Sequence, residues 1–430
     1  MKRYILNEEN KRNLLNDLLK RSTSNYPEFE KKVAAICDNI RANGDKALFE
    51  YTKQFDKFDL NESNIRVTEE EIEEAYKSLD PEFVKIMEEA ADNIKKFHMM
   101  QKRNSFFETS EEGTLLGQRI TAIEKVGVYV PGGKAAYPSS TLMNIIPAVC
   151  AGCERIVMVT PPNAEGKVNA STLAAAKICG VKEIYKVGGA QAIAALAYGT
   201  ESIPKVYKIV GPGNIFVALA KRYVYGHVSI DSIAGPSEIL VLADKTANPR
   251  FVAADLMSQC EHDEMASGIL VTTSSELADN VEKEVEKFML TAERKEILEK
   301  SLSTFGFILV ANNMDEAIEA VNDIASEHLE IITSNPVETM GKVKNAGAIF
   351  LGEYSSEPLG DYFAGPNHVL PTNGTAKFFS PLSVDDFIKK SSVICFSKEA
   401  LEKRHDKIEA FAKNEGLYAH ANSIAVRFEK

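Results

Sequence analysis

Short apolar runs alternate with helical patterns through most of the chain. From about residue 125, runs of four to six apolar residues suit buried strands, and the segments between them place apolar residues at helical spacing. The strand candidates fall into two blocks: 126–130, 155–160, 183–187 and 205–210, then 239–242, 268–272, 307–310 and 348–351. Strands that alternate with helices imply parallel, helix-covered sheets. We therefore predict an α/β protein with two incomplete, Rossmann-like parallel-sheet domains.

The two ends of the chain have a different pattern. Residues 1 to about 110 are mostly helical by their charged, amphipathic spacing, of which 81–97 is an example, and the chain becomes charged and helical again from about 381. The predicted domains are a helical N-terminal extension (1–25), an α/β domain of 26–129 with 239–380, a second α/β domain (130–238) and a helical C-terminal extension (381–430).

Glycine turns follow three strands of the first block. Pro131-Gly132-Gly133 follows the first strand, Gly188-Gly189-Ala190-Gln191 the third and Gly211-Pro212-Gly213-Asn214 the fourth. Such turns at strand ends let the backbone approach a ligand closely. None of them is GxGxxG, so the standard dinucleotide fingerprint is absent.

A candidate metal-ligand pair lies at the end of one helix in the second block. Asn248 followed by Pro249 marks a helix start, since Asn caps free N–H groups and Pro suits the first helical position. Gln259 and His262 are three residues apart near the end of this helix and project to the same side. The negative pole of the helix dipole favours a cation there.

Four histidines lie among Gly, Asp, Glu or Asn residues. They are His262, His328, His368 and His420. A single histidine beside a carboxylate is more often structural than functional. Together with Asp361, however, imidazole and oxygen ligands suit zinc or a similar divalent ion, and Glu327 beside His328 offers an acid and base pair. Spacing alone does not show that these residues meet.

Composition narrows the class of partner. Of the 430 residues, 44% are hydrophobic and 26% charged, as in ordinary globular proteins, and the formal net charge of −12 argues against a nucleic-acid partner. No signal peptide or membrane-spanning run is evident, so we expect a cytoplasmic protein with a small-molecule partner and no membrane partner.

The six cysteines do not form a disulfide framework. Cys150 and Cys153 have CxxC spacing but no second pair to complete a zinc site, which favours a structural role. Cys260 beside Gln259 is a candidate nucleophile for an aldehyde intermediate, but it points about 100° away from the ligand face, so we expect it to be inert packing.

Several motifs resemble histidinol dehydrogenase along nearly the whole chain. In order they are GVYVPGG, VGGAQAIAALAYGT, GPGN, IDSIAGPSE, SQCEH, SEHLE, GDYFAGPNHVLPT and EGLYAHA. The resemblance implies a zinc enzyme that oxidises L-histidinol through histidinaldehyde to L-histidine with two NAD in succession, the last step of histidine biosynthesis. It also implies an intertwined homodimer in which the C-terminal segment reaches the neighbouring active site.

The resemblance also implies roles for individual residues. The zinc ligands would be Gln259, His262, Asp361 and His420, which also contact substrate. His328 would take the alcohol proton, and Glu327 would activate water and contact substrate. Further substrate contacts would be Ser237, His368 and Glu415, and the NAD contacts would be Tyr129, Gln191 and Asn214 on the glycine turns.

Two other functions are compatible with the same residues. One is an enzyme on the same scaffold that oxidises another polar alcohol, and the other is a non-catalytic metal-binding or sensory protein derived from the enzyme. The presence of both Glu327 and His328 argues against the second.

Overall fold

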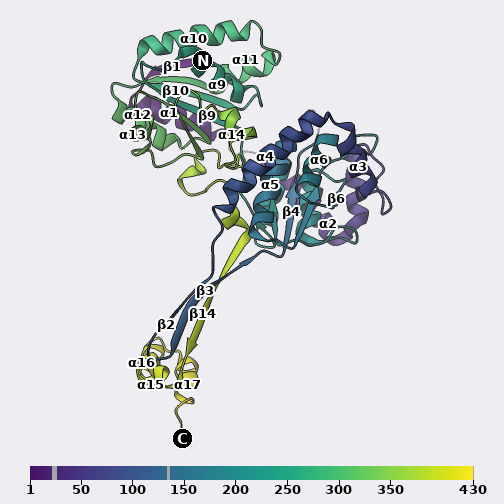
Figure 1. Cartoon of the computed structure of the whole chain (residues 1–430), viewed down its shortest axis with the longest axis vertical. Coiled ribbons are helices and arrows are strands. Elements are labelled where there is room, and N and C mark those ends of the chain that lie inside the picture. Colours follow the sequence, from purple (N-terminus) through teal and green to yellow (C-terminus); the bar gives the residue numbers. More distant parts are fainter. Residues whose placement is uncertain (22–26, 133–135, 430) are drawn as a thin grey trace. The chain divides into compact units, whose positions relative to one another are not determined.

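Six parallel strands form the larger sheet of the computed structural model, which describes residues 1–21, 27–132 and 136–429 (Figure 1). The strand order is β1-β11-β10-β9-β12-β13. The strands are β1 (Lys2–Ile5), β9 (Glu238–Ala243), β10 (Ser267–Thr272), β11 (Gly306–Val310), β12 (His328–Ile332) and β13 (Ala348–Leu351). β9, β10 and β12 are buried along their whole length because helices cover both faces of the sheet.

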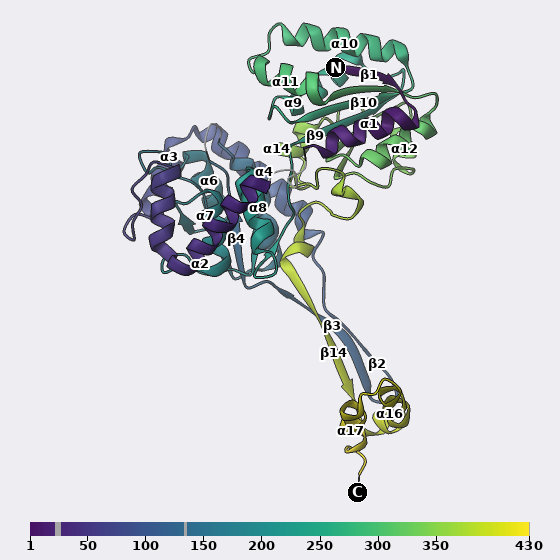
Figure 2. The same ribbon diagram turned by 180° about the vertical axis from the view of Figure 1, so that it is seen from behind.

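Alternate residues of β9 serve the two faces of this sheet. Leu240 and Leu242 pack with α1 and α12, whereas Ile239 and Val241 pack with α9, α10 and α11. The helices around the sheet are α1 (Glu8–Leu19), α9 (Pro249–Cys260), α10 (Ser275–Met289), α11 (Lys295–Phe305), α12 (Met314–Ile324), α13 (Pro336–Met340) and α14 (Glu357–Tyr362), and Figure 2 shows them from behind. As predicted, Asn248 caps α9, its side chain accepting from the N–H of Arg250.

The beginning of the chain differs from the predicted helical extension. Lys2–Ile5 is an edge strand that pairs in parallel with β11, and α1 follows it. Four residues, three of them exposed, are too few for periodicity to reveal a strand. The predicted boundary between residues 25 and 26 lies outside the described residues.

A second parallel sheet has the order β6-β5-β4-β7-β8. Its strands are β4 (Lys125–Tyr129), β5 (Arg155–Val159), β6 (Glu183–Tyr185), β7 (Lys208–Val210) and β8 (Ser229–Ile230). The associated helices are α2 (Pro27–Phe55), α3 (Glu69–Ser78), α4 (Pro81–Met99), α5 (Pro138–Ala151), α6 (Ala170–Ile178), α7 (Gly189–Tyr198) and α8 (Ile215–Val224). The α/β class with two parallel sheets is therefore confirmed.

The grouping of residues 26–129 with 239–380 does not match the packing. The apolar side of α2 joins α7 and α8 in one core, and β4 is the central strand of the five-stranded sheet. Amphipathic spacing shows that a helix has a buried side but not which sheet that side covers. By contacts, one unit comprises Met1–Gln101 with Ile123–Phe387, and a second comprises Lys102–Ala122 with Ile388–Lys430.

The second unit contains an antiparallel sheet of order β14-β3-β2. Its elements are β2 (Phe106–Thr109), β3 (Thr114–Ala122), β14 (Ile388–Phe396), α15 (Lys398–Glu402), α16 (His405–Asn414) and α17 (Tyr418–Ala425); two 3-10 turns, Thr375–Lys377 and Val384–Phe387, precede it in the first unit. The predicted helical extension of 381–430 does contain α15, α16 and α17, but it also contains the strand β14, which the prediction lacked. The sequence of β14 is mostly exposed and contains lysine, so it has no buried-strand pattern.

Two other predictions concern membranes and thiols. Within the described parts of the chain, no helix is both long and apolar enough to cross a membrane.

Cys150 and Cys153 are not joined in a disulfide, and burial raises the pKa of the Cys153 thiol to about 12. These facts agree with a structural role for the pair.

Candidate active site

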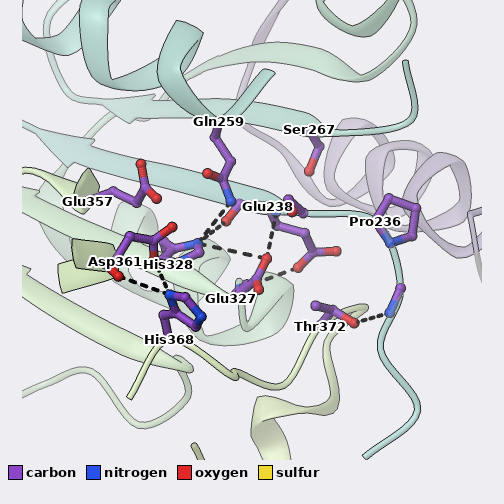
Figure 3. Close-up of polar contacts among 12 residues, drawn as sticks. Pro236, Glu238, Gln259, Ser267, Glu327, His328, Glu357, Asp361, His368 and Thr372 are labelled. Atoms are coloured by element: carbon purple, nitrogen blue, oxygen red, sulfur yellow. Dashed lines mark hydrogen bonds and ion pairs between the residues drawn. The ribbon is translucent and has the colours of Figure 1, made fainter. Parts of the chain in front are cut away.

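The adjacent strands β9 and β12 begin at the same edge of the six-stranded sheet and bring Glu327 and His328 against Glu238. The backbone N–H of Glu238 donates to Glu327 Oε2 over 2.9 Å, and His328 Nδ1 lies 2.9 Å from the Glu238 carbonyl oxygen (Figure 3). Glu327 and His328 are only 8% and 3% exposed. Strand pairing therefore holds the predicted acid and base pair in fixed positions.

The contacts of His328 define its tautomer. A carbonyl oxygen can only accept, so Nδ1 must carry the proton that it shares with Glu238. Gln259 Nε2 is 3.2 Å from the same nitrogen, but the amide nitrogen is also a donor, so we assign the hydrogen bond to the carbonyl. The other ring nitrogen, Nε2, is buried, has no hydrogen-bond partner among the described residues and lies 3.7 Å from Asp361 Oδ1. Nε2 is thus the atom available to exchange a proton with a ligand.

Burial and charge shift the pKa values of this group strongly. Burial raises the pKa of Glu327 to about 8, against the opposing charge of His328. Burial lowers the pKa of His328, but the carboxylates of Glu327 and Asp361 outweigh it and raise the value to about 10. Burial alone would raise the pKa of Asp361, but contact with His328 and the charges of His368 and His328 lower it to about 2. Opposite shifts in one cluster are typical of sites that move protons.

The donor set beside His328 fits a divalent cation. Gln259 is 1% exposed at the C-terminal end of α9, and its Oε1 has no hydrogen-bond partner among the residues that the structure describes. Asp361 on α14 contributes a carboxylate, and ligand atoms of His328, Glu357 and Asp361 all lie within 4.8 Å of one another. Imidazole nitrogen and carboxylate oxygen are common zinc donors, and the Gln259 amide oxygen adds a neutral oxygen donor.

His262 follows α9 and is close enough to respond to this cluster. Its side chain is exposed, but neighbouring protein lowers the pKa of its imidazole by desolvation, and the charge of Asp361 acts in the opposite direction. The fourth predicted ligand, His420, and the predicted substrate contact Glu415 belong to the second unit, where both side chains are exposed. In the first unit, Gln259 and Asp361 therefore both lie beside His328, and the imidazole of His262 is near enough for the charge of Asp361 to act on it.

Two further predicted substrate contacts lie around the same cluster. His368 Nδ1 donates to the Asp361 carbonyl oxygen over 3.0 Å and lies 3.8 Å from Asp361 Oδ1. His368 Nε2, the other ring nitrogen, lies 3.3 Å from Ser140 Oγ. Ser237 immediately precedes β9, and its carbonyl oxygen accepts from the N–H of Ser267. Both residues thus adjoin the elements that position Asp361 and Glu327.

The three predicted NAD contacts line one cavity of about 570 Å³ at the carboxyl ends of β4, β6 and β7. Tyr129, Gln191 and Asn214 all contribute to its wall. The Tyr129 hydroxyl accepts from the N–H of Gly189 over 3.2 Å, and a Cβ at Gly211, where φ is +121°, would collide with the Tyr129 carbonyl oxygen. This turn therefore requires glycine, and carboxyl ends of parallel strands are where ligands usually bind.

Comparison with known proteins identifies the family. The family model for histidinol dehydrogenase matches residues 19–428. The chain belongs to the histidinol dehydrogenase family. It is 56% identical over 412 residues to the histidinol dehydrogenase of Clostridium acetobutylicum, which covers 96% of this chain and 95% of that protein. It is 57% identical over 400 residues to that of Halalkalibacterium halodurans, which covers 93% and 94%.

A solved structure agrees with this assignment. The crystal structure of histidinol dehydrogenase from Elizabethkingia anophelis has a TM-score of 0.93 and 39% identity, covering 99% of this chain and 98% of that chain. The resemblance stated from the motifs is therefore confirmed, and the chain is an oxidoreductase of the histidinol dehydrogenase family.

Sequence reasoning missed three buried charged residues of this histidinol dehydrogenase family site. Glu357, 2% exposed, accepts from Ser258 Oγ, and burial next to Asp361 raises its pKa to about 8. Glu238, 3% exposed, pairs with Arg21, which is 1% exposed. The Glu of the GPSE motif was a visible signal for Glu238, but nothing in the local sequence marks Arg21 or Glu357.

Cys260 is packed as expected. Its side chain is fully buried, and burial raises the pKa of its thiol to about 11. A thiol in this environment is a poor nucleophile at neutral pH.

Proposed function

We propose that this chain oxidises L-histidinol to L-histidine through histidinaldehyde, with zinc and two molecules of NAD in succession. The observation that supports this most directly is the cluster of buried Glu327, His328 and Gln259 with half-buried Asp361, assembled from β12, α9, α14 and the loop before β12 (Figure 3). It combines a proton acceptor, a second carboxyl group and candidate metal ligands within one cluster. Family membership makes histidinol the preferred substrate.

Gln259, His262 and Asp361, with His420, would hold zinc, which when bound supplies positive charge that orients the substrate's imidazole and amine. Tyr129, Gln191 and Asn214 would bind NAD, which accepts a hydride in each oxidation. Ser237, His368 and Glu415 would contact the substrate directly, as would Glu327.

In the first oxidation, His328 Nε2 takes the proton of the alcohol as the carbinol carbon loses a hydride. Its Nδ1–H, held by the Glu238 carbonyl oxygen, keeps the ring oriented and leaves Nε2 as the acceptor. The charges of Glu327 and Asp361 favour the protonated form of His328. For His328 to act as a base it must be neutral, and this requires that the charge of Asp361 be balanced.

In the second oxidation, Glu327 takes a proton from the water that attacks the aldehyde carbon. The resulting hydrate anion gives up a second hydride, which NAD would accept, to form the carboxylic acid, and this acid ionises to the carboxylate. The Glu238 N–H holds Glu327 Oε2, so the other carboxyl oxygen remains for water. Burial, which raises the pKa of Glu327 to about 8, gives its carboxylate the basicity for this role.

We further propose an intertwined homodimer in the cytoplasm. Glu415 and His420 are exposed in the second unit, which has its own sheet and helices. Exposed residues of this type suit a role at a partner subunit's site, with the swapped segment completing it.

The test is product stoichiometry. Zinc-loaded enzyme should form two NADH for each L-histidinol consumed and yield L-histidine, whereas simple diols should give little turnover. Turnover of diols without turnover of histidinol would favour oxidation of another polar alcohol, and zinc binding without any NADH formation would favour a non-catalytic protein.

A further inference from the structure

Arg21 is a buried cation in contact with the strands β9 and β10. It is 1% exposed, and its guanidinium spans the segment that leads into β9. Nη1 donates to Glu238 Oε1 over 3.1 Å and to Ser267 Oγ over 2.8 Å. Nη2 donates to the carbonyl oxygens of Pro236 and Ser237 over 2.8 and 3.1 Å. One side chain therefore holds four acceptors on β9, β10 and the preceding turn.

Glu238 connects Arg21 to the proposed catalytic pair. Its Oε1 accepts from Arg21 and from the N–H of Asn373, and its Oε2 accepts from the N–H of Glu327 over 3.3 Å. Its backbone N–H donates to Glu327 Oε2, and its carbonyl oxygen accepts from His328 Nδ1, each over 2.9 Å. Every polar group of Glu238 thus faces either Arg21, Asn373 or the catalytic pair.

Stability alone is a weak reason for this ion pair. The side chains of Arg21 and Glu238 are 0% and 4% exposed, so both charges have lost their hydration, and that loss commonly offsets the attraction between them. The pair instead restricts movement. The planar guanidinium of Arg21 donates to four acceptors, so residues 236–238 have little freedom to shift.

We propose that Arg21 is a positioning residue for Glu327 and His328, acting through Glu238 and the carbonyl oxygens of Pro236 and Ser237. The guanidinium holds residues 236–238 from one side, and the Glu238 N–H and carbonyl oxygen hold Glu327 and His328 on the other. Without the fork, residues 236–238 can shift, and both catalytic side chains lose their alignment. This inference rests on the catalytic roles proposed above for Glu327 and His328.

The test compares two buried cations near the same sheet. Arg21→Met removes the fork, and Lys11→Met is the matched control. Lys11 is 7% exposed on α1 and pairs with Glu8, Glu319 and Asp323 over 2.8–3.2 Å, without contact to the catalytic pair. For zinc-loaded, folded enzyme, Arg21→Met should lower kcat for histidinol at least about tenfold, the scale of lost supporting contacts at active sites. In Arg21→Met, KM should change less than kcat. The control Lys11→Met should lower thermal stability while its kcat stays within about twofold of the parent value.

Two more variants separate alignment from simple destabilisation. Arg21→Lys keeps the charge but not the fork, so its kcat should remain well below that of the parent while stability is partly restored. This variant also serves as the test if Arg21→Met fails to fold. Glu238→Gln in the Arg21→Met background removes the unpaired carboxylate and should restore thermal stability more than kcat, because the carbonyl oxygens of Pro236 and Ser237 still lack their donor.

The inference is overturned if Arg21→Lys or Arg21→Met has parental kcat per folded, zinc-loaded chain, or if kcat and stability recover together in the double variant. Failure of the proposed function is distinguishable. Glu327→Gln with full activity would refute the catalytic assignment itself, whereas an inactive Glu327→Gln beside a fully active Arg21→Lys would refute only the role of Arg21.

Discussion

His328 Nε2 lies 3.7 Å from Asp361 Oδ1, and these two atoms join the proposed proton acceptor to a proposed zinc ligand. The pair comes from two elements, the start of β12 and the end of α14. Its electrostatic consequence is that Asp361, together with Glu327, favours a protonated His328 in the absence of a cation. A group that balances the charge of Asp361 therefore weakens the hold of His328 on its proton.

The first prediction follows from this pair. In metal-free protein, Asp361→Asn should lower the pKa of His328 from about 10, because a negative charge that favours the imidazolium is removed. Imidazole NMR titration measures the shift. Asp315→Asn, which changes an exposed carboxylate paired with Lys342, should leave the titration of His328 unchanged. An unchanged pKa in Asp361→Asn would contradict the coupling.

The second prediction concerns the metal. Gln259→Leu removes an amide oxygen that has no hydrogen-bond partner among the residues described, and it should weaken zinc affinity about tenfold or more. Zinc content after dialysis against a chelator measures this. Gln191→Leu is a matched control, since Gln191 is equally buried but lines the other cavity; it should retain zinc and raise KM for NAD. Equal zinc retention in both variants would refute the ligand role of Gln259.

The third prediction separates the two oxidations. Glu327→Gln should slow oxidation of histidinaldehyde about 10²–10⁴-fold, the usual range for loss of a general base, with a smaller effect on the alcohol step. Single-turnover measurement of NADH from each substrate distinguishes the steps. Cys260→Ala should leave both steps intact, because its thiol is buried. If Cys260→Ala instead abolished aldehyde oxidation with normal zinc content, the roles of Glu327 and water would have to be abandoned.

The fourth prediction is a pH effect in the proposed NAD cavity. Asp56, which lines this cavity, has a buried Oδ2 without a hydrogen-bond partner among the described residues, and burial raises its pKa to about 6. The folded state then holds the proton more tightly than the unfolded chain. The contribution of this proton to the free energy of unfolding is fully present below the ordinary pKa of 3.8, and it is lost as the pH rises through about 6.

Asp56→Asn removes this dependence. The free energy of unfolding of the variant, relative to the parent, should therefore increase between about pH 4 and pH 7.5 by about 1–2 kcal/mol, after allowance for partial solvent exposure. Urea denaturation at both pH values measures it. An identical difference at the two pH values would show that the carboxyl group titrates normally.

The fifth prediction tests the exchanged segment. Glu327→Gln and His420→Asn chains are each expected to be nearly inactive, but their mixture should recover about one quarter of parental activity. Half of randomly exchanged dimers are hybrids, and each hybrid has one intact site of two if His420 acts in trans. No recovery despite demonstrated subunit exchange would place His420 in the site of its own chain.

Much of the first unit was predictable from local patterns. Most strands of the two parallel sheets are apolar runs between turns, so β4, β5, β9, β10 and β11 fall within a residue or two of the predicted ranges. The cap of α9 was equally visible, because Asn248 and Pro249 act on the adjacent backbone alone. Strands with weak patterns, such as β1 and β14, were missed since their neighbours, and not their own periodicity, determine their pairing.

By itself, the sequence determined the α/β class, the glycine turns, the helix that presents Gln259, and the family through its motifs. Only the tertiary structure showed that β9 and β12 start side by side, so that Glu238 contacts both Glu327 and His328. It also showed that Arg21, more than 200 residues away in sequence, pairs with Glu238. The physical reason is the range of the interactions. Capping and apolar periodicity act between near neighbours, whereas the pairing of buried charges depends on which distant segments exclude water together.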